Sequence, residues 1–121
     1  MDHYLVITNY MNFPKGGIAD FAKIAAKVDT EMAGDLAKLA EYGEIIINKI
    51  ATMTADGGKG LAIVKIKEGH LEKAFDLAAK YHGRTAMGAP GYTFIIEIFY
   101  GPEATGELTG IKFGEMYEKA K

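Results

Sequence analysis

The chain has 121 residues, 49% of them hydrophobic, which is typical of one folded domain and excludes a disordered chain. It has no cysteine, which excludes disulfides and thiolate metal sites, and its net charge of −2, with lysine and arginine dispersed, lacks the basic stripe that nucleic-acid binding needs. The apolar runs are too short to cross a bilayer, so we expect a cytoplasmic domain with neither a nucleic-acid nor a membrane partner.

The first half of the chain contains patterns for a strand, a long helix and a hairpin. Residues 3–11, HYLVITNYM, are rich in β-branched and aromatic types, which predicts a strand. From Ile18 onward, apolar residues recur at three- and four-residue spacing, which predicts an amphipathic helix of about 24 residues with a kink or break near Gly34. Segments 44–54 and 61–67 are typical of strands, and the ADGGKG turn between them indicates a hairpin.

The second half contains one helix, one strand and a glycine-rich connection. Residues 68–82 predict an amphipathic helix, and residues 92–100, YTFIIEIFY, predict the last strand. Gly83 is expected to be the C-cap of the helix, which places His82 at the negative end of the helix dipole, where histidine is favourable. The stretch that begins at Arg84, RTAMGAPG, is then expected to be a flexible loop at the rim of a cavity.

The predicted order is β-α-β-β-α-β followed by a tail. This order predicts an α+β fold of the ferredoxin-like kind, in which an antiparallel sheet carries both helices on one face. We expect a ferredoxin-like domain over residues 1–100 and a C-terminal tail over residues 101–121. The tail is expected to open as a glycine-rich loop and to end in a short extra helix from about Phe113.

The strand pattern leaves the second face of this sheet too apolar for contact with water. Strands that met water there would alternate apolar and polar residues, and the last strand does not, because Ile95 and Phe99 share a face with Glu97. The residues expected on this open face are Tyr4, Val6, Thr8, Tyr10, Leu61, Ile63, Lys65, Thr93, Ile95, Glu97 and Phe99. Those expected under the helices are Leu5, Ile7, Ala62, Val64, Ile66, Phe94, Ile96 and Ile98. Large exposed apolar patches mark interfaces or ligand cavities, so we expect a homodimer or a higher homo-oligomer that packs sheet on sheet.

The open face also carries a few polar groups among apolar ones, which is the usual form of a small-molecule site. Glu97 is a candidate general base whose pKa burial raises, Lys65 is a candidate to hold an anionic substrate oxygen, and Tyr10 completes the candidate catalytic set. The ligand-binding candidates on this face are Tyr4, Thr8, Phe99 and, depending on the register of the second strand, Asn48 or Lys49. The alternative is that Lys65 and Glu97 form an interface ion pair or reach solvent at the rim.

No motif for a metal or for a phosphate loop is found. The histidines His3, His70 and His82 lie on separate predicted elements and lack metal-ligand spacing, so no metal site is expected. The GGKGLA segment has a lysine among glycines, but it lies in a hairpin rather than before a helix, and therefore lacks the helix N-terminus that binds phosphate.

The element order, the GGKGLAIVKI turn and strand, and the helix GHLEKAFDLAAKY resemble the dimeric α/β-barrel superfamily. More narrowly, they are similar to uncharacterised small domains in it that carry a GG-x-G turn, over about residues 3–100. The resemblance implies a homo-oligomer that needs no cofactor and binds a small organic ligand between sheet and helices or across the sheet interface. Members include cofactor-free monooxygenases, isomerases, haem-handling enzymes and ligand-binding or regulatory modules. Oxygenation or isomerisation of a small aromatic or enolic compound is one activity that it implies.

A second resemblance concerns the segment after the second helix. Arg84 and Thr85, followed by Gly88 and Gly91, are similar to the Arg-Thr and spaced glycines that touch a nucleotide phosphate in PII-type nucleotide-sensing proteins, which share this fold. It implies an alternative function as a nucleotide- or effector-sensing regulatory protein that binds its anion through Arg84 and His82. The first helix here is longer, and the hairpin shorter, than in that family. A structural assembly module is a third alternative.

Overall fold

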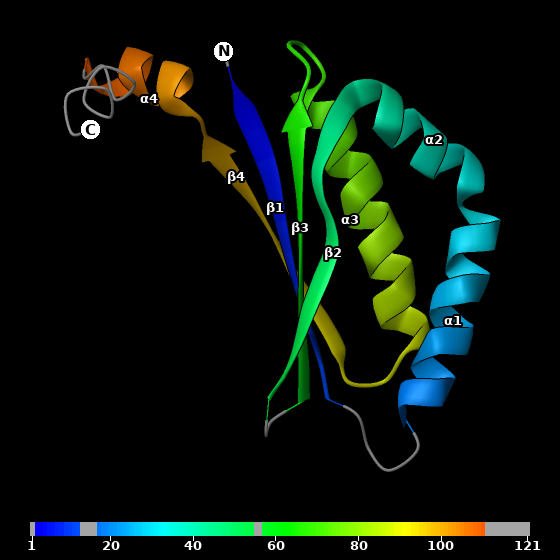
Figure 1. Ribbon diagram of the computed structural model, residues 1–121. Coiled ribbons are helices and arrows are strands. Elements are labelled where there is room, and N and C mark those ends of the chain that lie inside the picture. Colours follow the sequence, from blue (N-terminus) through cyan, green and yellow to red (C-terminus); the bar gives the residue numbers. More distant parts are fainter. Residues whose placement is uncertain (1, 13–16, 55–56, 111–121) are drawn as a thin grey trace.

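The computed structural model describes residues 2–12, 17–54 and 57–110 (Figure 1). Its elements are β1 (His3–Met11), α1 (Gly17–Glu31), α2 (Ala33–Tyr42), β2 (Gly43–Thr54), β3 (Gly57–Ile66), α3 (Leu71–Gly88), β4 (Tyr92–Tyr100) and α4 (Pro102–Thr109). The strands form one antiparallel sheet in the order β2-β3-β1-β4. Helices α1, α2 and α3 lie on one side of this sheet (Figure 1). The predicted α+β, ferredoxin-like arrangement is therefore confirmed.

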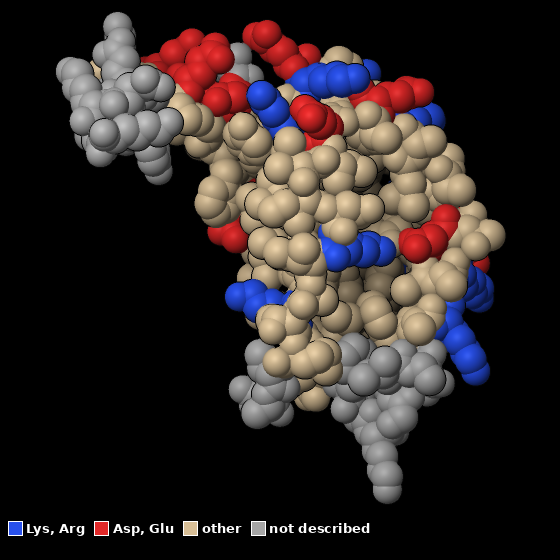
Figure 2. All heavy atoms as spheres, in the orientation of Figure 1, with Lys and Arg blue, Asp and Glu red and all other residues tan. Residues whose placement is uncertain are grey.

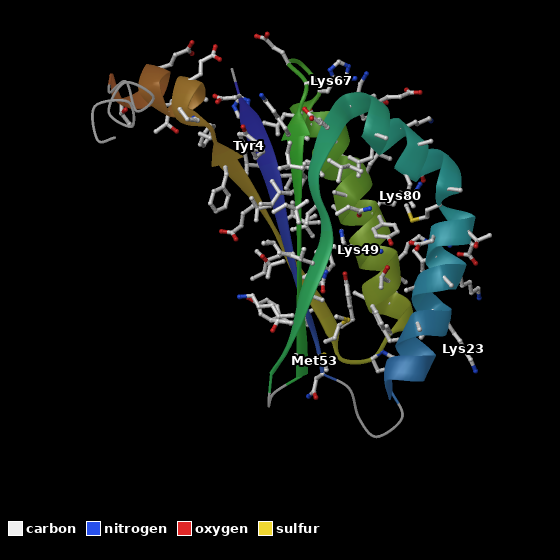
Figure 3. The ribbon with its side chains drawn as sticks, in the orientation of Figure 1. Tyr4, Lys23, Lys49, Met53, Lys67 and Lys80 are labelled. Carbon is white, nitrogen blue, oxygen red and sulfur yellow. The ribbon has the colours of Figure 1, made fainter. Side chains whose placement is uncertain are left out.

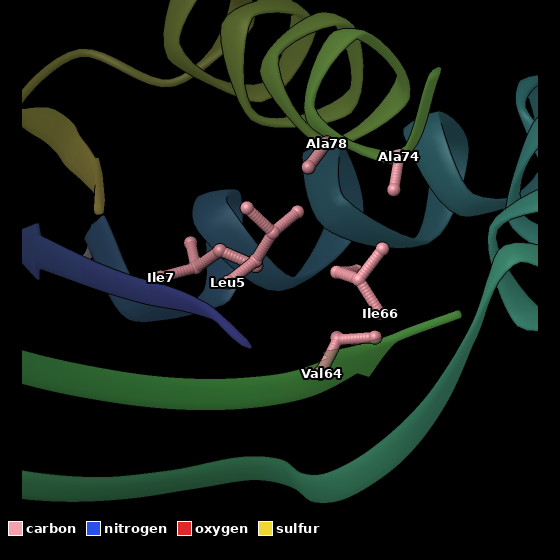
Figure 4. Close-up of a cluster of buried hydrophobic side chains, with 6 residues drawn as sticks. All are labelled: Leu5, Ile7, Val64, Ile66, Ala74 and Ala78. Atoms are coloured by element: carbon pink, nitrogen blue, oxygen red, sulfur yellow. The ribbon is translucent and has the colours of Figure 1, made fainter. Parts of the chain in front are cut away.

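The main core forms where α3 packs on the two central strands (Figure 4). Strands β1 and β3 contribute large aliphatic side chains that point toward the helix, as the strand pattern predicts, and α3 contributes two alanines one turn apart. The buried residues of this cluster are Leu5, Ile7, Val64, Ile66, Ala74 and Ala78. Because alanine side chains are short, α3 lies close to the strands here, and this contact sets the position of its C-terminal half.

The long first helix is divided at Met32 into α1 and α2. The break expected near Gly34 falls two residues earlier, at a side chain that is 1% exposed and packs with Val28 and Tyr81 in a second buried cluster. Backbone hydrogen bonds from Met32 to the Val28 carbonyl (2.9 Å) and from Leu36 to the Met32 carbonyl (2.9 Å) span the break. The break is therefore a bend that lets both helices follow α3.

The hairpin between β2 and β3 is tighter than predicted. The ADGGKG segment is predicted to be a turn, but β3 begins at Gly57 and includes most of it. Gly58 and Gly60 are buried in this part of the strand. A side chain at position 60 would place its Cβ 2.6 Å from Oδ1 of Asn9 on the neighbouring strand, so only glycine lets the two strands pair there.

Strand β2 is irregular at Asn48 and Lys49, the two residues whose position in the register the sequence leaves open. Its pairing with β3 shifts between Ile45 and Ile47 and again between Ile47 and Ile50. Lys49, inside the second shift, has φ of 57°, in the left-handed region that residues other than glycine rarely adopt. Bulges of this kind change the face to which a side chain points. As a result, Ile47 and Ile50 both lie opposite open-face residues of β3, although an odd–even alternation would separate them.

Helix α3 is longer than predicted and includes most of the segment that was expected to be a loop. Because it ends at Gly88, Gly83 lies inside the helix, and the predicted C-cap at Gly83 and the predicted helix end at His82 are wrong. The C-cap is Ala89, whose N–H donates to the Thr85 carbonyl (2.9 Å). An interior glycine costs only about 1 kcal/mol. Burial of His82 and Thr85 on the sheet-facing side of the helix outweighs that cost.

The tail begins with a helix and not with the predicted glycine-rich loop. Helix α4 follows β4 directly, has proline in its first turn, and ends at Gly110, whose φ is 75°. The carboxylate of Asp2 accepts the Ala104 N–H (2.8 Å), so a residue from the other end of the chain satisfies the start of this helix. The short helix predicted from about Phe113 lies outside the described residues. No described helix is both long and apolar enough to cross a membrane.

The position of Gly83 inside α3 is testable by a matched pair of substitutions. Gly83→Ala is expected to raise the free energy of unfolding by about 0.5–1 kcal/mol, because alanine favours helix and its Cβ meets nothing within 4 Å. Gly91→Ala is expected to lower it, because φ there is 84° and the Cβ would lie 2.6 Å from the Asn12 carbonyl oxygen. Denaturant unfolding measures both. A Gly83→Ala variant less stable than the parent would identify Gly83 as a cap.

Candidate functional site

The open face of the sheet brings together four of the predicted site residues. Tyr4 on β1 lies opposite Lys65 on β3 and Phe99 on β4, and Glu97 lies one row further along, opposite Val6. Lys65 and Glu97 therefore flank β1, about 10 Å apart across two strand spacings. Both are exposed in the single chain, so the burial that would make Glu97 a general base requires a second copy over this face.

The other two open-face candidates lie apart from this group. Thr8 is 9% exposed in the middle of the face. Tyr10 is six residues beyond Tyr4 on the same strand, which is about 20 Å. There the Lys59 ammonium lies 5.7 Å from the centre of the Tyr10 ring. The structure therefore does not bring Tyr10 to Lys65, and the predicted catalytic set is not one cluster.

The predicted residues on α3 lie away from the open face. Arg84 is exposed near the end of α3 and forms an ion pair with Glu31 of α1 (2.7 Å), so the phosphate-binding loop implied by the second resemblance is a helix instead. His82, two residues earlier, is buried against the sheet. Asn48 is exposed on the edge strand beside the bulge. No group of three histidine, aspartate or glutamate side chains within the described ranges is placed to hold a metal ion.

A cavity of about 220 Å³ lies between the helices and the sheet. Its apolar walls include Phe21 and Ala25 of α1 and Met11 of β1. The polar groups that line it are Asn9, Lys49, Tyr81, His82, Thr85 and Tyr92. Of the residues that line this cavity, the sequence pointed to His82, to Lys49 as the alternative to Asn48, and to Thr85 through the second resemblance. Tyr81 and Tyr92 were missed because the helix was predicted to end at His82. Only the longer α3 brings Tyr81 and His82 to the same cavity as Tyr92.

His82 and Tyr92 form one polar pair in this cavity. His82 Nδ1 lies 2.8 Å from the Tyr92 hydroxyl, the two rings are parallel within 2°, and the Phe94 ring centre lies 5.5 Å from that of His82. Burial, with a contribution from the Lys49 charge, lowers the pKa of His82 to about 4. Burial raises the pKa of Tyr92 to about 12. At neutral pH both groups are therefore uncharged.

The hydrogen bond determines which nitrogen of His82 carries its proton. The Tyr92 hydroxyl is buried and needs an acceptor for its proton, and the described residues offer it Nδ1 alone. On this ground we assign Tyr92 as the donor to Nδ1, which places the ring proton on Nε2. Nε2 has no hydrogen-bond partner among the described residues, yet no fully buried side-chain nitrogen or oxygen there is unsatisfied. Nε2–H is therefore open to the cavity.

A second polar chain crosses the cavity from β2 to α1. The Lys49 ammonium donates to the Tyr81 hydroxyl (3.3 Å), and that hydroxyl donates to the Asp29 carboxylate in a short hydrogen bond. Figure 3 places Lys49 between β2 and α3. Burial and the hydrogen bond to Asp29 raise the pKa of Tyr81, so this hydroxyl remains protonated. Three elements are therefore joined through one tyrosine.

The buried, neutral His82 makes stability depend on pH. Its folded pKa of about 4 lies below the unfolded value of 6.5, so its stabilisation is complete above pH 6.5 and is lost as the pH falls toward 4. Over this range the free energy of unfolding of the parent protein is expected to fall by about 2–4 kcal/mol more than that of the His82→Gln variant. Denaturant unfolding from pH 7 to 4 measures both, and the other histidines are common to the two proteins. Parallel pH profiles would refute a neutral His82.

Comparison with known proteins identifies the fold and no family. No family model and no curated protein matches the chain. Among solved structures, the de novo designed protein Foldit4 has a TM-score of 0.55 and 4% identity over 84% of this chain and 99% of its own. A dimeric ferredoxin-like protein from an uncultured marine organism has a TM-score of 0.50 and 9% identity over 84% of this chain and 90% of its own.

A third structure is more distant. It is a monooxygenase of Streptomyces coelicolor, from the gene ActVA-Orf6, in complex with the ligand Nanaomycin D. Its TM-score is 0.42, with 15% identity over 82% of this chain and 88% of its own. This similarity is too low to support a conclusion about the present chain. The first two likenesses agree with the element order and the strand order of the sheet. The chain has a ferredoxin-like fold, the fold on which dimeric α/β barrels are built.

Proposed function

We propose that the protein binds a small organic molecule in the cavity between its sheet and helices and associates with itself through the open face of the sheet. The observation that carries the proposal is the cavity itself, in which Lys49, His82 and Asn9 lie among apolar and aromatic walls. A mostly apolar hollow with a few placed polar groups is the usual form of a small-molecule site. Its volume of about 220 Å³ limits the ligand to a small compound.

The open face supports self-association. The large hydrophobic residues exposed on it are Tyr10, Ile50, Ile95 and Phe99. Figure 2 shows acidic and basic side chains gathered at the end of the molecule where α4 lies, and fewer charged side chains over the middle of the molecule. A second copy related by a two-fold axis would cover this face and bury its apolar side chains together with Lys65 and Glu97. The dimeric state named for one structural neighbour is consistent with this arrangement.

A more specific proposal concerns the reaction and the class of substrate. Phe21 and Tyr92 stack on each other, with ring centres 5.7 Å apart, and both line the cavity, so its lining includes aromatic surface that suits an aromatic ligand. Oxygenation or isomerisation of a small aromatic or enolic compound without a cofactor fits such a site. Glu97 and Lys65 enter this proposal as interface residues. Arg84 does not enter it, because its ion pair with Glu31 and its place in α3 remove the loop on which nucleotide sensing depends.

Ligand binding is testable by narrowing the cavity. Ala25 of α1 lines it, so Ala25→Leu is expected to weaken the binding of one-ring aromatic compounds by tenfold or more. Ala26→Leu, at the next position of α1 and exposed, is the matched control and is expected to bind like the parent. Isothermal titration against a panel of neutral and anionic one-ring aromatics measures this. If no compound of the panel binds the parent, or if both variants bind alike, the cavity is not a ligand site, and a structural assembly module is the remaining alternative.

Self-association is testable by placing a charge on the open face. Phe99 is 50% exposed there, and Phe99→Glu is expected to convert the dimer to a monomer, because an interface buries the new carboxylate. Met87, 90% exposed at the end of α3, allows the same kind of change away from the sheet, and Met87→Glu is expected to stay dimeric. Sedimentation velocity at micromolar concentration distinguishes the states. A monomeric parent protein would contradict the proposed self-association.

A further inference from the structure

The lining of the cavity includes two N–H donors, those of Lys49 and His82, and neither lies within ion-pair distance of a carboxylate of the described residues. We propose that the Lys49 ammonium and the His82 Nε2–H form a subsite for a carboxylate, so that the cavity takes a small aromatic carboxylic acid in its ionised form. This inference rests on the proposed ligand site and assigns the chemical class of its ligand. Four observations support it: the backbone at Lys49, the partners of its ammonium, the tautomer of His82 and the shape of the apolar walls.

The backbone of β2 directs the Lys49 side chain into the cavity through an unfavourable left-handed conformation. Ile47 and Ile50 both lie on the open face, so regular alternation would place residue 49 on that face with Ile47. The register shift and the positive φ of 57° at Lys49 rotate its side chain instead to the side of the helices, where it reaches Tyr81. A lysine in the left-handed region is unfavourable by itself, and bulges frequently re-aim a side chain beside a functional site.

The charge of Lys49 has no carboxylate partner within ion-pair distance in the described part of the chain. Its hydrogen-bond partner is the neutral hydroxyl of Tyr81, and that hydroxyl already donates its proton to Asp29. Asp29 therefore holds Tyr81 in place, and Tyr81 in turn positions the ammonium. The Lys49 residue is exposed in the single chain, and its ammonium forms a charge-assisted hydrogen bond when an anion with hydrogen-bond acceptors enters the cavity.

His82 supplies the second donor from the opposite wall. The Tyr92 hydroxyl occupies Nδ1, so the proton of the neutral ring is on Nε2, which opens to the cavity. The influence of the Lys49 charge on the His82 ring places the two groups in one electrostatic environment. A carboxylate has two oxygens that accept hydrogen bonds, and it therefore suits a pair of donors better than an uncharged carbonyl does.

The apolar part of the cavity limits the rest of the ligand to one ring. An engineered cavity of about 150 Å³ holds benzene. At about 220 Å³, this cavity has room for a benzene-sized ring with a carboxylate attached. Phe21 and Tyr92, whose rings stack on each other at an angle of 18°, contribute aromatic surface to the lining against which such a ring packs.

The test compares two ligands of nearly the same shape, benzoate and benzamide, by isothermal titration of the whole chain at pH 7. The parent protein is expected to bind benzoate at least tenfold more tightly than benzamide. Lys49→Met keeps most of the unbranched side chain and removes its ammonium group. It is expected to reduce benzoate affinity by about tenfold to a hundredfold while changing benzamide affinity little. Lys73→Met, an exposed lysine of α3, is the matched control and is expected to bind both like the parent.

The outcomes separate this inference from the proposed function. Equal affinity of the parent for benzoate and benzamide, or full benzoate affinity in Lys49→Met, would overturn the carboxylate subsite while the cavity remains a ligand site. Failure of the wider aromatic panel to bind would overturn both. A second readout follows the His82 imidazole by NMR. Its Nε2–H resonance is expected to shift with benzoate and to shift less with benzamide, and an unmoved resonance in the benzoate complex would also overturn the inference.

Discussion

The close packing of α3 on the central strands determines most of the remaining structure. Ala74 and Ala78 bring the helix down onto Leu5 and Val64, and with the first half of α3 held there, its second half continues over the sheet. Tyr81, His82 and Thr85 of that second half, followed by the turn to β4, form the wall of the cavity opposite the strands. An α3 that ended at His82 would not form this wall. The penalty for an interior glycine at position 83 is small beside what this burial contributes.

The two polar chains in the cavity depend on elements that are distant in sequence. One joins His82 to Tyr92 across the turn between α3 and β4, and the other joins Lys49 through Tyr81 to Asp29 across β2, α3 and α1. Neighbouring residues of α3, Tyr81 and His82, therefore anchor both chains with their rings at 86° to each other, 5.0 Å between centres. Because each hydroxyl proton has an acceptor, the network leaves the cavity two outward donors and no fully buried unsatisfied polar side-chain atom in the described residues.

The two faces of the sheet divide the proposed roles between them. The helix face carries the cavity and the buried polar groups, whereas the open face carries exposed aliphatic and aromatic side chains with Lys65 and Glu97 at one end. Strand β2 contributes to both, because its bulge directs Ile50 to the open face while Lys49 reaches the helix side. The face proposed for self-association and the cavity proposed for ligand binding therefore share one irregular edge strand.

Local patterns along the chain were sufficient to predict the fold. Alternation in β1 and β3 assigned Leu5 and Val64 to the core, and three- and four-residue spacing revealed the helices, because burial of one face imposes these periods on any chain that folds. The same patterns could not reveal that Gly83 is helical, nor that Lys49 leaves its expected face. Both depend on the balance between a local backbone cost and contacts with residues far along the chain, such as Tyr92 and Tyr81. The strand patterns consequently indicated the open face for most of the candidate site. Only the packed molecule brings Lys49 and His82 together with Tyr81 and Tyr92 around one cavity.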